Sequence, residues 1–164
     1  MRDRSKIRKI LQKYGGDILN SETFQQSREY VQHGDFSVWK HSLNVAETSL
    51  RLSRVLPFKF SERALIRGAL LHDYFQYDWH DRKIGRREIF EFYKMHGFTH
   101  PATAARNARR DFHIGKLENE IIRKHMWPLT IVPPRSREAW VVTMADKYCS
   151  MMETFHLMRG DLCG

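Results

Sequence analysis

The sequence feature that most constrains the fold is an apolar run from Ala64 to Leu71, which ends in an adjacent imidazole and carboxylate, His72 and Asp73. Because the run is apolar at nearly every position, a helix built from it has no polar face and must be surrounded by other elements. Charged and imidazole side chains are costly to bury unless they are paired or bind a metal. The position of His72 and Asp73 at the end of a buried segment therefore predicts a metal site.

The remaining pattern predicts helices and no convincing strands. With 164 residues, 41% of them hydrophobic, the chain has the size of one domain, 1–164, with a single core. Serines stand where helix N-caps are expected, and prolines where helices end. The expected helices cover about 21–33, 37–56, 61–77, 87–95, 101–112, 117–127 and the segment from 136 onward, and the stretch 4–13 is short, basic and weakly amphipathic. The fold class predicted is all-α, a compact bundle of about six or seven helices joined by short loops.

The formal net charge of +9 favours anionic partners such as nucleotides, other phosphates or nucleic acid, although a surplus of this kind is also typical of a solvated surface. No run of about 18 apolar residues is long enough for a membrane helix. The segment Met1 to Lys13 is charged where a signal peptide would be apolar. We therefore expect a cytoplasmic protein without a membrane partner.

Several polar residues, His72 among them, occupy positions where helical spacing predicts a core side chain. Each follows an apolar residue by three or four positions, so it shares that residue's inward face. These residues are His41, His72, His125 and Asp146. His100 stands beside Pro101 at an expected helix start instead. Each histidine alone is typical of an ordinary core or surface residue, but so many inward imidazoles and carboxylates in one small core are hard to satisfy without a cation.

The order of these residues resembles the HD superfamily of metal-dependent phosphohydrolases, whose name comes from the His-Asp dipeptide. The resemblance covers about residues 37–155 and includes Leu70-Leu71 before the pair and Ala145 before the last aspartate. Some branches of the superfamily have two more histidines, which His100 and His125 match. The resemblance then implies six ligands for two metals, with Asp73 bridging. The implied ligands are His41, His72, Asp73, His100, His125 and Asp146.

The resembling branches include symmetrical dinucleoside tetraphosphate hydrolases and helical mixed-valence di-iron oxygenases. Neighbouring residues on a helix diverge by about 100°, so His72 can bind one ion while Asp73 spans two ions roughly 3.5–4 Å apart. Four imidazoles and two carboxylates suit iron, manganese, cobalt, nickel or zinc better than magnesium. The resemblance favours iron. It implies hydrolysis of a phosphoester or phosphoanhydride in a small, nucleotide-type substrate by attack of a metal-bound hydroxide.

The sequence departs from the family pattern after the His-Asp pair, where many of the hydrolases have a lysine and this chain has Tyr74-Phe75-Gln76-Tyr77. Gln76 can hydrogen-bond a substrate but supplies no charge. The residues predicted to act in catalysis are Asp73, Gln76 and His80, with His80 as proton donor to the leaving group. The residues predicted to bind substrate are Lys147, Arg82 and Lys83, through charge, and Trp127, by stacking on a base. The alternative interpretation makes Trp127 a core anchor and His80 a solvated loop residue.

Two other functions compete with a phosphohydrolase. The first is a di-iron oxygenase that cleaves a C–P or C–C bond with O2. The second is a basic helical module that binds nucleic acid and whose metal site is vestigial or structural. The hydrolase is favoured because basic charge suits phosphate and because hydrolases are the commoner members of the resembling family.

Overall fold

The computed structural model describes residues 2–33, 36–75 and 86–160. Apart from a 3-10 turn at Gln26–Arg28 and one short antiparallel pair, β1 (Val31–His33) and β2 (Phe36–Ser37), its regular elements are α-helices. The helices are α1 (Arg2–Leu19), α2 (Glu22–Gln25), α3 (Val38–Val55), α4 (Glu62–Leu71), α5 (Arg86–Phe112), α6 (Lys116–Lys124) and α7 (Arg137–Gly160). The all-α prediction is confirmed. Within the described part of the chain, no helix is both long and apolar enough to span a bilayer.

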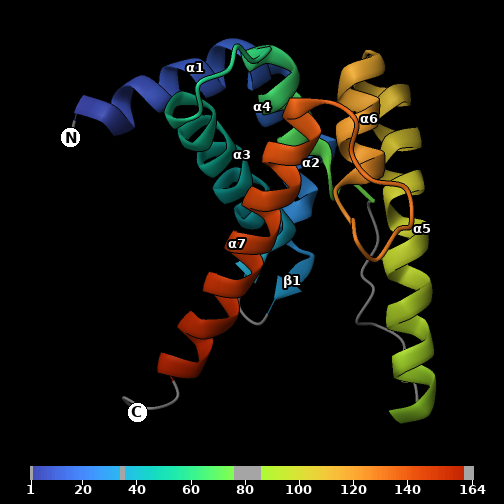
Figure 1. Cartoon of the computed structure of the whole chain (residues 1–164). Helices are drawn as coiled ribbons and strands as arrows, with labels where there is room; N and C mark the ends of the chain where they lie inside the picture. Colours follow the sequence, from blue (N-terminus) through green and yellow to red (C-terminus); the bar gives the residue numbers. More distant parts are fainter. Residues whose placement is uncertain (1, 34–35, 76–85, 161–164) are drawn as a thin grey trace.

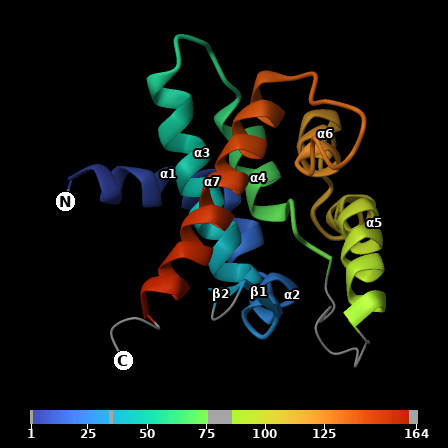
Figure 2. The ribbon, with the colours of Figure 1, turned by 60° about the horizontal axis from the view of Figure 1, so that its bottom comes forward.

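Helix α4 is the centre of the bundle, as its uniformly apolar sequence predicts. Every residue from Ala64 to Leu71 is buried. Helix α1 crosses one end of α4, helices α3 and α7 pack against it on one side, and α6 packs on the other (Figure 1). Helix α5 packs against the outer side of α6, and α7 lies across α3 (Figure 2). The C-terminal end of α4 therefore lies where side chains from α3, α5, α6 and α7 can converge.

Serine side chains begin four of the helices, as expected from the sequence. In each case the hydroxyl accepts a hydrogen bond from a backbone N–H in the first turn, which would otherwise have no partner. The distances are 3.2 Å for Ser21 and Phe24, 3.3 Å for Ser37 and Lys40, 3.3 Å for Ser61 and Ala64, and 3.2 Å for Ser136 and Ala139. These caps fix where α3, α4 and α7 start, and so the register of the residues that follow.

The expected helix over 21–33 is wrong. Helix α2 ends at Gln25, the 3-10 turn follows, and the chain then enters β1. The hydroxyl of Ser27 donates to the carbonyl of Phe24 at 2.6 Å, which helps to tighten the turn. The β-branched Val31 and its aromatic neighbour Tyr30 favour extended backbone over helix. Tyr30 then packs against Val38 and Phe75.

Two other expected boundaries are also wrong. Helix α5 continues through Pro101, where we expected a new helix to begin. A proline inside a helix removes one backbone hydrogen bond, but neighbouring turns can keep the helix continuous. Helix α4 ends at Leu71 and not near Tyr77, with His72 as its C-cap. His72 and Asp73 are consequently at a helix end, where side chains can turn away from the helix axis.

A buried arginine joins three helices. The guanidinium of Arg67 on α4 donates to Asp17 of α1 at 2.6 and 2.8 Å and to the carbonyl of Phe112 at 3.0 Å, at the end of α5. We expect Arg67→Met to lower the free energy of unfolding by about 1.5–3 kcal/mol, since hydrogen bonds to a charged group are lost in a buried site. Chemical denaturation measures this. Arg8→Met on the exposed side of α1 is the control and should stay within about 0.5 kcal/mol; equal effects would contradict the prediction.

Candidate metal centre

Six polar side chains from five helices or helix ends converge inside the bundle. His41 comes from α3, His100 from α5 and Asp146 from α7, while His72 and Asp73 follow α4 and His125 follows α6. All six are buried. Donor atoms from them form three overlapping groups in which all atoms lie within 4.8 Å of one another. The groups are His41, His72 and Asp73; His72, His125 and Asp146; and Asp73, His100 and His125.

The carboxylate of Asp73 lies between two pairs of imidazoles. Its Oδ2 atom is 3.3 Å from Nε2 of His72 and 3.9 Å from Nε2 of His41. Its Oδ1 atom is 3.2 Å from Nε2 of His100 and 3.4 Å from Nε2 of His125. Each oxygen therefore faces a different pair of nitrogen donors, which is the arrangement expected of a carboxylate shared by two cations.

Asp146 lies on the side of the cluster that contains His41 and His72. Its Oδ1 atom is 3.1 Å from Nε2 of His41 and 3.7 Å from Nε2 of His72. On the opposite side, the Nε2 atoms of His100 and His125 are 3.0 Å apart. The donors thus form two sets that share Asp73. One set has the imidazoles of His41 and His72 with the carboxylate of Asp146. The other set has the imidazoles of His100 and His125.

The ends of α4 and α6 fix the tautomers of two of the histidines. His72 and His125 each stand just past the last helical residue, where backbone carbonyls have no helical partner. Nδ1 of His72 donates to the carbonyl of Ala69, and Nδ1 of His125 donates to that of Ile122, both at 2.7 Å. When the imidazoles are neutral, their Nε2 lone pairs therefore point into the cluster, as metal ligation requires.

The donor set fits a cation. Among the described atoms, Nε2 of His72 is buried without a hydrogen-bond partner, and it faces Oδ2 of Asp73 at 3.3 Å. A nitrogen lone pair and a carboxylate oxygen repel each other at this distance unless a proton or a metal ion lies between them. The carbonyl ends of α4 and α6 add negative partial charge near the same point. A positively charged group is therefore favoured at the centre of the cluster.

The protonation states of the two carboxylates also suit metal binding. Burial opposes the charge of Asp73, but the nearby His72 and the imidazoles of His100 and His125 hold its pKa well below the usual range. Burial likewise opposes the charge of Asp146, whose pKa is nevertheless lowered, by His41 and His72. Ionised carboxylates are the form that binds metals.

His41 differs from His72 and His125 in the partner of its outer nitrogen. Its Nδ1 atom lies 2.8 Å from Oε2 of Glu153. Burial opposes protonation of His41, but hydrogen bonds with Asp146 and Glu153 outweigh it and raise the pKa to about 9. Sequence reasoning missed Glu153. The signal was its position seven residues after Asp146, which places both carboxylates on one face of α7.

Comparison with known families agrees with this geometry. A family model described as the HD domain matches residues 38–151. The chain belongs to the HD domain family. All six converging side chains lie within the matched segment. Comparisons with curated proteins and with solved structures gave no match. The HD domain and its buried His/Asp cluster together support a metal-dependent hydrolase.

Two of the predicted substrate-binding residues, Lys147 and Trp127, lie within the described part of the chain. Nζ of Lys147 lies 3.7 Å from Oδ2 of Asp146 and 3.5 Å from the carbonyl of His125, so it is at the edge of the cluster. Trp127 is half-buried, and its ring packs edge-to-face on Trp140 with centroids 4.9 Å apart. This contact is typical of a packing role, but part of the Trp127 side chain remains exposed. The other residues predicted to act in catalysis or substrate binding, Gln76, His80, Arg82 and Lys83, lie outside the described residues.

Proposed function

We propose that this HD domain is a phosphohydrolase with a two-metal centre, which cleaves a phosphoester or phosphoanhydride bond of a small, nucleotide-type substrate. The observation that carries the proposal is the position of Asp73, whose two oxygens each face a pair of histidine nitrogens within 4 Å. A carboxylate placed in this way can bind two neighbouring cations at once, one through each oxygen. Membership of the HD family supports the hydrolytic reaction.

The proposed ligands divide between the two metal positions. His41, His72 and Asp146 would hold one ion, His100 and His125 the other, and Asp73 both. Iron is the favoured metal, with manganese, nickel, cobalt or zinc as alternatives, because imidazole-rich sites suit these ions better than magnesium. A bound pair of such ions would acidify a water molecule and withdraw negative charge from phosphate oxygens.

Charge around the centre suits an anionic substrate. The side chain of Lys147 is 45% exposed, so its ammonium can contact solvent or substrate while it stays near Asp146. The net charge of +9 attracts phosphates toward the domain. We further propose that Gln76 hydrogen-bonds the substrate, that His80 protonates the leaving group, that Arg82 and Lys83 bind phosphate and that Trp127 stacks on the base.

A substrate panel tests the proposed function. Protein stripped of metal and reloaded with iron or manganese should release product from at least one phosphomonoester, phosphodiester or dinucleoside polyphosphate, and the metal-free protein should not. Oxygen consumption is measured in parallel. Intact phosphate esters together with oxygen uptake would replace the hydrolase with the oxygenase alternative. Salt-sensitive oligonucleotide binding that survives His72→Ala in a folded protein, without turnover, would favour the nucleic-acid module.

A further inference from the structure

The outer hydrogen bond of His41 differs from those of His72 and His125. Nδ1 of His72 and of His125 each donate to a neutral backbone carbonyl of their own helix. Nδ1 of His41 instead contacts a carboxylate, that of Glu153. A carboxylate behind an imidazole makes the other ring nitrogen a stronger metal donor than a carbonyl does. Negative charge is therefore added on the side of His41.

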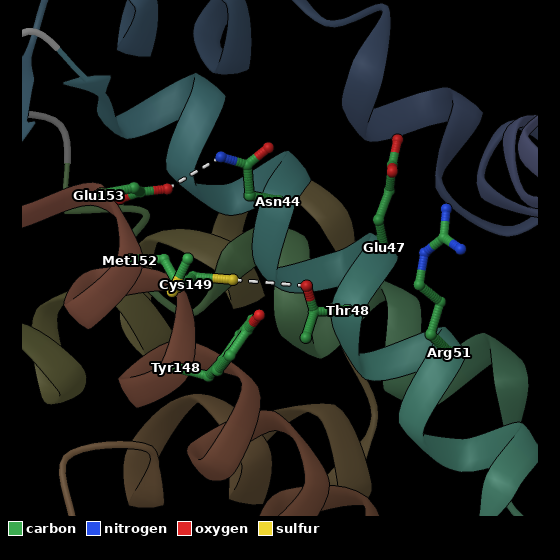
Figure 3. Close-up of a pocket in the computed structure, with 8 residues that line it drawn as sticks. All are labelled: Asn44, Glu47, Thr48, Arg51, Tyr148, Cys149, Met152 and Glu153. Carbon is green, nitrogen blue, oxygen red and sulfur yellow. Dashed lines mark hydrogen bonds between the residues drawn. The ribbon is translucent and has the colours of Figure 1, made fainter. Parts of the chain in front are cut away.

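The carboxylate of Glu153 is held in place at both oxygens. Oε2 contacts His41 at 2.8 Å, and Oε1 accepts from Nδ2 of Asn44 at 2.9 Å. Figure 3 shows the Asn44 amide on α3 and the Glu153 carboxylate on α7 turned toward each other. Glu153 is only 4% exposed. A buried carboxylate so constrained keeps the His41 ring in one orientation.

We infer that Glu153, fixed by Asn44, is a positioning residue that strengthens the metal position formed by His41, His72 and Asp146. The inference rests on the proposed two-metal centre and adds to it a residue outside the ligand set. Glu153 contacts the outer nitrogen of His41 and is not itself a ligand.

A cavity gives access to this pair from the surface. Asn44 and Glu153 are on the wall of an open pocket of about 240 Å³ between α3 and α7 (Figure 3). The rest of its wall is formed by Glu47, Thr48, Arg51, Tyr148, Cys149 and Met152. A small carboxylic acid such as formate or acetate fits a space of this size. Shortening Glu153 to alanine therefore opens a route by which an added carboxylate can replace the missing one.

The test measures metal binding and not only activity. Apo protein is titrated with Mn²⁺ or Fe²⁺ by calorimetry, and bound metal is counted by elemental analysis. We expect Glu153→Ala to weaken one of two binding events by about 10–100-fold, the usual effect of removing an outer-shell partner. Glu153→Gln keeps a hydrogen-bond acceptor but loses the charge, so its loss should be smaller. The other binding event should be unchanged in both variants.

Glu138→Gln is the matched control on the same helix. Glu138 is a buried carboxylate of α7 that accepts from the backbone N–H of Ser61 at 2.8 Å, and it is not one of the six residues of the cluster. We expect it to leave both metal affinities unchanged. Equal losses in Glu138→Gln and Glu153→Gln would overturn the inference, as would a Glu153→Ala variant that binds both ions as tightly as the original protein.

Chemical rescue separates positioning from packing. Sodium formate or acetate should restore part of the metal affinity of Glu153→Ala, whereas sodium chloride at the same ionic strength should not. If neither carboxylate restores affinity, the loss comes from repacking of α7 and the positioning role is overturned. These results are distinct from failure of the proposed function, which would show as absent metal binding or absent hydrolysis in the original protein.

Discussion

Asp73→Asn is expected to lower phosphohydrolase activity by about 10³-fold or more. Asparagine keeps the volume of the side chain, but it removes the charge that both metal positions share between His72 and His100. Metal ions supply several kcal/mol of transition-state stabilisation, and each 1.36 kcal/mol corresponds to about a tenfold change in rate. The measurement is kcat/KM on the substrate found in the panel, together with bound metal per chain.

Asp111→Asn is the control for that substitution. Asp111 accepts from the hydroxyl of Tyr74 at 3.0 Å and pairs with Arg110, so it is close to the same part of the chain without belonging to the cluster. We expect its activity to remain within about threefold of the original, because a surface pair of this kind is worth only about 0–1 kcal/mol. Activity retained by Asp73→Asn would contradict the shared-carboxylate account.

Gly68→Ala is expected to destabilise the protein although it adds only one methyl group. A Cβ atom at Gly68 would lie 2.7 Å from both Cδ1 and Cγ2 of Ile121 and 2.8 Å from its Cβ. Alanine favours a helix over glycine by about 0.5–1 kcal/mol, but overpacking a core costs about 1–3 kcal/mol. The clash should dominate, because Cβ of Ile121 cannot move without moving α6. We expect a net loss of about 1–2 kcal/mol by chemical denaturation.

The Gly68→Ala substitution should also change the geometry of the metal centre. Helix α6 precedes His125, so a shift of α6 away from α4 moves that imidazole relative to Asp73. We expect metal affinity to fall with stability in Gly68→Ala. The control is Gly16→Ala, where the new Cβ meets only the flexible end of Gln12, at 2.9 Å. That variant should be as stable as the original or more stable, and equal destabilisation of both would disprove the packing explanation.

The sequence was sufficient to predict the class of fold and the convergence of the six side chains. Apolar residues on every face of 64–71 placed α4 at the centre, and serine caps set the starts of α3, α4 and α7. Polar residues at core positions identified the cluster, because burial without a partner is too costly to be common. The resemblance added His100, whose helical context we had predicted wrongly.

The outer contacts of the cluster could not be predicted in the same way. The partners of His72 and His125 are carbonyls of their own helices, and they depend on where α4 and α6 end, which periodicity gives only within a few residues. The contact between His41 and Glu153 joins residues 112 positions apart, so it depends on how α3 and α7 cross. No local pattern encodes that crossing.

Elemental analysis of metal-reconstituted protein tests the central claim most directly, which is that His41, His72, Asp73, His100, His125 and Asp146 bind a pair of cations. The account predicts two transition-metal ions per chain in the original protein, fewer than two in Asp73→Asn, and higher thermal stability when the ions are bound. Absence of bound metal in a folded protein, with thermal stability unchanged when iron or manganese is added, would contradict it.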